Sequence, residues 1–367
     1  MNWGDESIDT ITIWNQATVT HTYASEGVYT INITGTIVGW QFNEGGDRFK
    51  ILEIQQWGCL RLGNSGGYFD GCCNLKITAI DSLNLTGTTS LYRAFEECKN
   101  LGTSGNMNSW DVSSVTNMHN MFDGASSFNQ PLDNWDVSSV TDMRFMFGGA
   151  SSFNQPLINW NVSSVTDMRG MFGAASSFNQ PLENWDVSSV TDMSVMFDET
   201  PSFNQPLDNW DVSSVTDMGY MFSYALSFNQ PLDNWDVSSV TDMGYMFRYA
   251  FSFNQPLGNW NVSSVTDMDG MFYAIALSTS NYDNLLLGWS QLNLRTGVTF
   301  HAGYSKYSSA AADAREFIIT QFSWTIMDGG LKKPGSPAIS GYILGLIVAT
   351  LGISIALVIK KKYDIKN

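Results

Sequence analysis

Acidic side chains recur at two fixed positions of a 25-residue pattern that fills the middle of the chain. Carboxylates stacked about 5 Å apart repel one another unless they are solvated, capped by hydrogen bonds or bridged by cations. The first position allows two interpretations, a calcium ladder or a ladder of side-chain hydrogen bonds, because Asn replaces Asp at Asn161 and Asn261. The calcium candidates in this column are Asp136, Asp186, Asp211 and Asp236.

The second acidic position follows a serine by three residues, as Asp142 follows Ser139. This is the spacing of a helix capping box, with Asp in place of the usual Glu. A carboxylate at a helix N-terminus is stabilised without any ion, so capping explains this column. Its members are Asn117, Asp142, Asp167, Asp192, Asp217, Asp242 and Asp267.

Two groups of residues are candidates for binding a partner. The first is the exposed polar part of the predicted strands, represented by Asp133, Asn134 and Asp136. The second stands at positions that differ between copies, and it either binds a partner or covers one side of the coils. This second group is an aromatic cluster of Tyr220, Tyr224, Tyr245 and Tyr249.

The sequence lacks the motifs of the common enzyme classes, among them GxSxG, HExxH and the P-loop. A carboxylate pair for glycoside hydrolysis is compatible with 35 acidic residues, but near-identical copies do not build one asymmetric site. We therefore predict no enzymatic activity and no cofactor apart from the calcium alternative. A net charge of −17 disfavours nucleic acid, whose phosphates need clustered Lys and Arg.

One copy, residues 128–152, shows which elements would position these side chains. The stretch QPLDNWDV is typical of a short strand with a proline at its start. Met143, Met146, Phe147 and Ala150 follow at the helical spacing i, i+3, i+4, i+7. We therefore predict a repeat solenoid of the α/β leucine-rich-repeat-like class, with one short strand and one short helix per 25-residue coil.

The apolar residues of the pattern are predicted to form the core, since each touches its own copy in the coils above and below. The tryptophans have an alternative role as exposed platforms for sugars, but the flanking Asn and Asp leave only one apolar face. The predicted core includes Trp135, Met143, Met146, Phe147, Trp160, Trp185, Trp210 and Trp235.

Within the segment 1–48, residues 8–40 alternate apolar and polar side chains, which is typical of antiparallel strands. The stretches WGDE (3–6) and VTHTYASEGVYTINITG (19–35) resemble the second half of a PKD-like β-sandwich, with Glu6 replacing the last Gly of that family's Trp-Gly-Asp-Gly turn. We therefore expect a partial sandwich whose N-terminal strands are truncated. His21 is expected to pack and to form a hydrogen bond beside the turn.

Residues 49–104 are predicted to be diverged copies that cap the regular repeats of residues 105–277. Cys72 and Cys98 stand at the small-residue position of the pattern, as buried free thiols or as a disulfide between stacked neighbours. Residues 278–330 leave the pattern and are predicted to close the last coil.

Residues 339–359 carry no charge, and as a helix they would be long enough to cross a bilayer core of about 30 Å. A linker at 331–338 precedes them, and a lysine-rich tail at 360–367 follows, which the positive-inside rule places in the cytoplasm. These features predict a single-pass membrane protein at the cell surface, with extracellular repeats and a cytoplasmic C-terminus.

The phrase FNQPLxNWDVSSVTDMxxMF resembles the 25-residue repeat of BspA-like leucine-rich-repeat surface proteins over about residues 105–277, and more loosely over 49–330. The resemblance implies a surface or secreted protein, which in some members adheres to host or matrix proteins. The expected function is that of a membrane-anchored, non-catalytic binding or adhesion module for an extracellular protein or glycan. The alternative is a passive structural envelope or stalk protein without a specific ligand.

Overall fold

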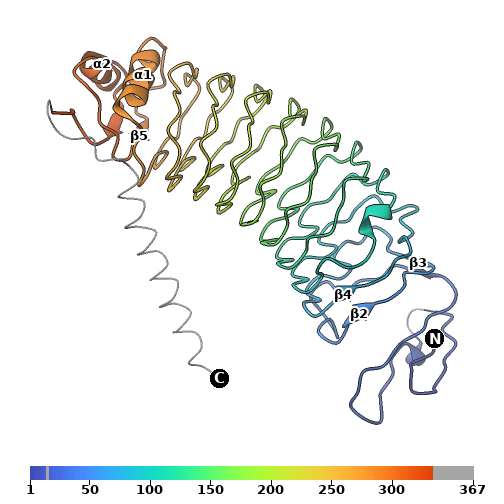
Figure 1. The fold of residues 1–367 in the computed structure, drawn as a ribbon. Coiled ribbons are helices and arrows are strands. Elements are labelled where there is room, and N and C mark those ends of the chain that lie inside the picture. Colours follow the sequence, from blue (N-terminus) through green and yellow to red (C-terminus); the bar gives the residue numbers. More distant parts are fainter. Residues whose placement is uncertain (14–15, 334–367) are drawn as a thin grey trace, which may run out of the picture.

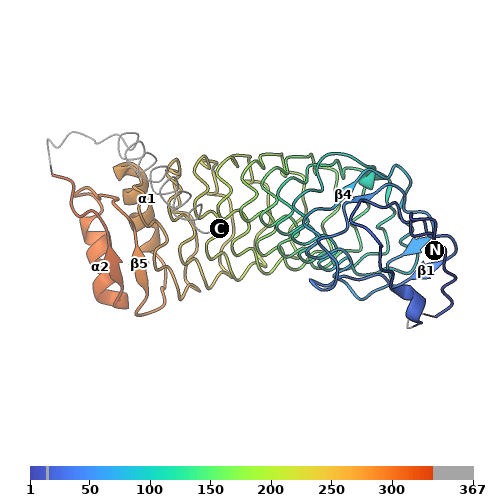
Figure 2. The ribbon, with the colours of Figure 1, turned by 90° about the horizontal axis from the view of Figure 1, so that it is seen from below.

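The computed structural model describes residues 1–13 and 16–333. Between an N-terminal segment and a C-terminal pair of helices, the chain winds into coils that lie side by side along one long axis (Figures 1 and 2). The elements in chain order are the 3-10 helix η1 (Ala17–Val19), β1 (Ile37–Val38), β2 (Glu53–Ile54), β3 (Leu60–Arg61), β4 (Lys76–Ile77), the 3-10 helix η2 (Met107–Ser109), α1 (Thr279–Trp289), β5 (Thr299–His301), α2 (Ala312–Phe322) and β6 (Thr325–Met327).

Neighbouring coils are joined by short parallel pairings. Strand β1 pairs with β3, β2 with β4, and β5 with β6. The regular copies between them pair through single-residue parallel bridges, which run along the acidic column from Asn117 to Asp142 and on to Asp267. These bridges hold equivalent residues of successive coils directly beside one another.

The segment 142–150 is a chain of turns whose backbone N–H groups bond alternately to the next coil and within their own coil. Phe145 and Phe147 donate their backbone N–H groups to the next coil, to the oxygens of Arg169 (2.8 Å) and Met171 (2.9 Å). Met146, between them, donates within its own coil. Phe145 has φ +49° and Gly149 has φ +61°, a left-handed conformation that a right-handed helix does not contain.

The predicted fold class is therefore wrong. In the described part of the chain, α1 and α2 are the only α-helices, and both lie after the regular copies. The copies consist mostly of turns, with short pairings and no closed sheet. The copies therefore do not have the predicted strand and helix of a leucine-rich-repeat coil. In a helix the backbone N–H groups would bond within the same segment, whereas here alternate N–H groups bond to the next coil.

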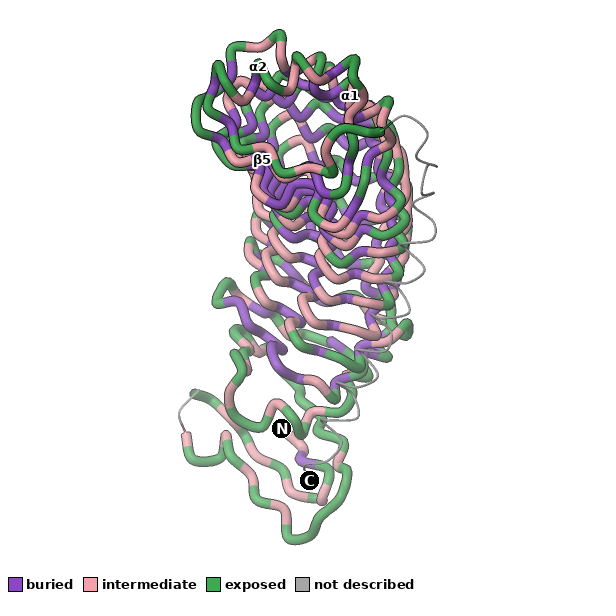
Figure 3. Tube along the Cα trace, turned by 90° about the vertical axis from the view of Figure 1, so that its left-hand side faces the viewer, coloured by how far each residue is buried: buried purple, intermediate pink, exposed green. Residues whose placement is uncertain are grey.

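The interior consists of columns of equivalent side chains, and Figure 3 marks buried residues along the trace of each coil. The rings of Trp135 and Trp160 stack with centroids 6.3 Å apart and an angle of 2°, and those of Phe147 and Phe172 stack at 5.7 Å. The tryptophans therefore pack inside and offer no exposed platform. The following residues are each at most 3% exposed: Trp135, Met143, Met146, Phe147, Trp160, Trp185, Trp210 and Trp235.

Residues 1–48 do not form the predicted β-sandwich. Their described part contains one two-residue strand, β1, and isolated antiparallel bridges made by Asn2. A sandwich needs two sheets over a shared apolar core, whereas Trp3 is the one buried side chain described in this segment. The ring of His21 stacks on Trp3 with centroids 4.9 Å apart, and its Nε2 lies 2.8 Å from Asp5.

Helices α1 and α2 cover the last coil (Figure 1). Helix α1 begins after Ser278, whose Oγ accepts the N–H of Asn281. The hydroxyl of the buried Tyr282 donates to Asp328 at 2.7 Å, and Arg315 Nε donates to the same oxygen at 2.7 Å. This network ties α1 and α2 to the chain after β6 and closes the apolar end of the stack.

The prediction of a single-pass membrane protein needs correction. Within residues 1–13 and 16–333, no helix is long and apolar enough to cross a membrane. The predicted segment 339–359 lies outside the described residues, as do the tail 360–367 and all but the first residues of the linker 331–338. The structure therefore does not support a membrane anchor or the extracellular location that was derived from it.

Candidate functional site

The acidic column runs along one side of the coils. We call this column, with the residues two, three and seven positions after each acid, the ladder face. The Oδ1 of Asp142 accepts the N–H of Arg144 at 3.1 Å, and the Oδ1 of Asp192 accepts that of Ser194 at 2.8 Å. The same bond recurs at every member of the column from Asn117 to Asp267. These side chains therefore close short turns, and the predicted helix cap is wrong.

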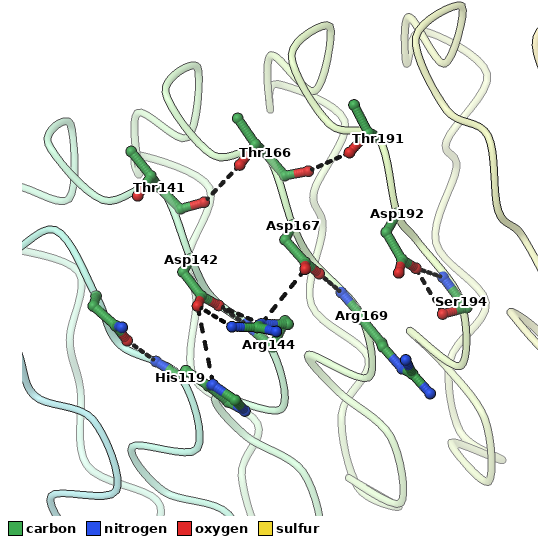
Figure 4. Close-up of polar contacts among 11 residues, drawn as sticks. His119, Thr141, Asp142, Arg144, Thr166, Asp167, Arg169, Thr191, Asp192 and Ser194 are labelled. Carbon is green, nitrogen blue, oxygen red and sulfur yellow. Dashed lines mark hydrogen bonds and ion pairs between the residues drawn. The ribbon is translucent and has the colours of Figure 1, made fainter. Parts of the chain in front are cut away.

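A guanidinium neutralises the N-terminal end of this column (Figure 4). The Nη2 of Arg144 lies 2.6 Å from Asp142 Oδ2, and its Nε lies 3.0 Å from Asp142 Oδ1. The same Nε lies 3.4 Å from Asp167 Oδ2 in the next coil. Burial acts to raise the pKa of Asp142, but the hydrogen bonds and charge of Arg144 outweigh it and lower the pKa.

Farther along the column the acids lack such a cation. Asp217, Asp242 and Asp267 come from three successive coils and line a cavity of about 270 Å³. None of the three forms an ion pair within the described residues. Burial, and then the charges of the acids on either side, raise the pKa of Asp217 despite the N–H bond from Gly219.

The predicted tyrosine cluster lies on the ladder face as two short columns. The rings of Tyr220 and Tyr245 stack at 4.8 Å, and those of Tyr224 and Tyr249 at 4.6 Å. The guanidinium carbon of Arg248 lies 5.1 to 5.7 Å from the ring centroids of Tyr224, Tyr245 and Tyr249. These distances suit cation–π attraction, so Arg248, which was not predicted from the sequence, belongs to the same patch.

A second cavity of about 360 Å³ shares Tyr245 as a wall with the first. Arg248, Asp269 and His301 are among its lining residues. Gly270 also lines it, with φ +63°, and a Cβ added there would collide with the ring of Tyr245. Only glycine therefore lets that ring lie flat against the neighbouring coil.

The other predicted binding residues lie apart from the tyrosines. The Oδ1 of Asp133 accepts a hydrogen bond from Asn108 at 3.1 Å, and the backbone N–H of Asn134 donates to the same amide at 2.9 Å. Asp136 is exposed, and its Oδ1 accepts the hydroxyl of Ser138 at 2.6 Å. No hydrogen bond or ion pair joins this group to the tyrosines in the described structure, so the predicted surface divides into two.

The calcium candidates are exposed, and each holds the serine two residues later. Asp186 and Asp211 accept their serine hydroxyls at 2.6 Å, as Asp136 does, and Asp236 accepts the N–H of Ser238 at 3.0 Å. Hydrogen bonds from serine lower the pKa of Asp136 and Asp211. In the residues that the structure describes, no group of three or more His, Cys, Asp or Glu side chains is placed to hold a metal ion.

Cys72 and Cys98 are buried free thiols. Burial raises the pKa of Cys72 to about 12, and the Sγ of Cys98 donates to the oxygen of Phe69 at 3.0 Å. Thiols that stay protonated are poor nucleophiles. Both side chains therefore serve as small packing groups at this position of the coil.

Comparison with known protein families finds one match. A family model described as "Mycoplasma protein of unknown function, DUF285" matches residues 89–200 and 171–285, which together span more than half of the chain. No curated protein matches the sequence.

Proposed function

We propose a non-catalytic binding function for this chain, which belongs to the family described as Mycoplasma protein of unknown function, DUF285. The ladder face would hold a protein or glycan partner. The resemblance of the repeat to BspA-like proteins, some of which adhere to other proteins, is consistent with this role. The second candidate is a passive structural role without a specific ligand.

The observation that carries the proposal is the pair of tyrosine columns. The interior positions keep the same residue type in nearly every copy, but the positions of Tyr220 and Tyr224 are occupied by Val195 and Glu199 one coil earlier. Packing of the coils does not require tyrosine there, since other coils use other residues. Tyrosine and arginine dominate the energetics of many binding surfaces, because they bury large area and offer hydrogen bonds.

Arrays of proteins and glycans probed with the full chain test the proposal. We expect at least one ligand whose binding weakens tenfold or more in the double variant Tyr220→Ser/Tyr245→Ser. The matched control is Tyr304→Ser, because Tyr304 is 57% exposed and lies in the C-terminal segment. Absence of any ligand, or binding that the double variant leaves unchanged, would favour the passive structural role.

A further inference from the structure

Arg144 shows how the ladder face holds a cation. Its guanidinium makes two hydrogen bonds to Asp142 and lies 3.4 Å from Asp167 in the next coil. The planar group thus spans two carboxylates that successive coils present at a fixed separation. This geometry suits the forked donors of arginine better than the single ammonium of lysine.

The position of Arg144 is occupied by Arg169 and Ser194 in the next two coils. Three and four coils after Arg144 it is occupied by Gly219 and Gly244, which leave it without a side chain. A Cβ on Gly219 would lie 3.2 Å from Asp217 Oδ1 and 3.3 Å from Asp242 Oδ1, so the glycine stands between two carboxylates as Arg144 does. The cavity of about 270 Å³ lies at this place.

Two further features make the cavity suitable for a guanidinium. Tyr220 and Tyr245 stack on each other and line it, and an arginine packs well on a tyrosine ring. Arg169 is the one cationic residue that lines the cavity, and it is exposed and forms no ion pair in the described part of the chain. Asp217 keeps a raised pKa there, whereas Asp142 beside Arg144 has a lowered one.

We infer that the cavity formed by Asp217, Asp242 and Asp267 binds the guanidinium of an arginine side chain from a partner protein. The inference rests on the proposed binding function and names the chemistry of its partner. A seated guanidinium would bridge the carboxylates of adjacent coils, as Arg144 does within the chain, while its face packs on Tyr220 or Tyr245. A metal ion is a poorer occupant, because no group of three or more metal-ligating side chains is placed together in the described residues.

The probe is a fluorescent peptide, Gly-Arg-Gly-Arg-Gly, measured against the full chain by anisotropy. Its matched control carries citrulline at both arginines, which keeps the shape and removes the charge. The test variant is Asp217→Asn/Asp242→Asn. Asparagine retains the turn, because Asn117 closes the same turn with the N–H of His119 at 2.9 Å.

Two more variants distinguish binding of the peptide in this cavity from general attraction between the acidic chain and a cationic peptide. Asp186→Asn/Asp211→Asn changes the net charge equally in the other acidic column, where Asn161 and Asn261 occur naturally. Gly219→Arg/Gly244→Arg should fill the seat from within the chain, as Arg144 does. Neither glycine has a left-handed φ, so the backbone accepts the substitution.

We expect the arginine peptide to bind at least tenfold more tightly than the citrulline peptide. Binding should weaken tenfold or more in Asp217→Asn/Asp242→Asn and in the double arginine variant, and less than twofold in Asp186→Asn/Asp211→Asn. Equal binding of the two peptides, or equal losses in the two Asp→Asn variants, would overturn the inference.

The array experiment distinguishes this failure from failure of the proposed function. An array ligand, such as a neutral glycan, could bind through the tyrosines but not through Asp217 and Asp242. That result would contradict the inferred guanidinium site and still support the proposed binding function. No array ligand and no peptide binding would overturn both.

Discussion

The indole Nε1 of Trp160 donates a hydrogen bond of 2.9 Å to the backbone oxygen of Leu132 in the preceding coil. The same bond recurs along the column from Trp135 to Trp289. Trp110 starts this column, and its Nε1 has no partner within the described residues. Trp110 therefore serves as a control for how much this hydrogen bond contributes to stability.

Replacing Trp185 by Phe removes one of the two hydrogen bonds to the oxygen of Leu157, which also accepts the backbone N–H of Trp160 at 3.1 Å. We expect Trp185→Phe to lower the free energy of unfolding by about 2–3 kcal/mol. Trp110 is equally buried, at 3% exposed, but it has no such bond to lose, so Trp110→Phe should cost about 1 kcal/mol less. Urea unfolding measures both, and equal losses would show that the hydrogen bond contributes little.

Val195 has φ +52°, which is unfavourable for a β-branched residue. Its equivalents Gly170 and Gly270 are glycines. We expect Val195→Gly to raise the free energy of unfolding by about 1 kcal/mol. Asp208→Gly is the control, because Gly258 occupies the equivalent position without a positive φ, and it should lower stability by about 0.5–1 kcal/mol. A loss of stability in Val195→Gly would contradict the inference that the backbone of Val195 is strained.

Gly270→Ala should disturb the tyrosine columns, because the new Cβ would collide with the ring of Tyr245. We expect it to lower the unfolding free energy by about 2–3 kcal/mol and to weaken array binding. The control Gly297→Ala has a similar φ of +75° but no atom within 4 Å of the added Cβ, so it should cost about 1 kcal/mol. Equal losses would mean that the ring moves aside freely.

Asp123 predicts a dependence of stability on pH. Burial, followed by the charges of Glu96 and Glu97, raises the pKa of Asp123 in the folded state to about 7. The unfolded chain loses this proton near its ordinary pKa of about 4. Between these values the folded state binds more protons, so this group's contribution to stability falls as pH rises from 4 to 7. Asp123→Asn should therefore stabilise the protein at pH 8 and change it little at pH 4.

Asp136 is the control with the opposite sign. Hydrogen bonds from Ser138 lower its pKa in the folded state, so its contribution is present above the unfolded pKa and is lost as pH falls through the folded one. Asp136→Asn should then destabilise the protein slightly at pH 8, and by less as the pH is lowered to 3. Thermal melts across this range measure both variants, and parallel curves for them would contradict the assignment of the two shifts.

The sequence period relates equivalent residues, since residues 25 apart, such as Trp135 and Trp160, stack in the structure. It does not reveal the path of the chain within a copy. Met143, Met146, Phe147 and Ala150 have helical spacing, but a chain of turns buries the same positions. A signal against the helix was present: glycines recur at Gly170 and Gly270, and at Gly149 four residues after Phe145, where left-handed residues stand.

The tyrosines of the candidate site were predictable, because they stand at variable positions of the pattern. The cavity beside them was not. It depends on the absence of side chains at Gly219 and Gly244 and on ring positions set by packing between coils. The acidic column suggested a helix cap, because an Asp that closes a turn and an Asp that caps a helix have the same local spacing.

In each copy, alternate N–H groups bind the next coil, as those of Phe145 and Phe147 do. A pulling force applied to the two ends of the chain would act on one such row of bonds at a time, since a coil contacts only its neighbours. Each coil that detaches would release about 85 Å of extended chain for its 25 residues. The molecule would lengthen in equal steps under load and dissipate mechanical work coil by coil.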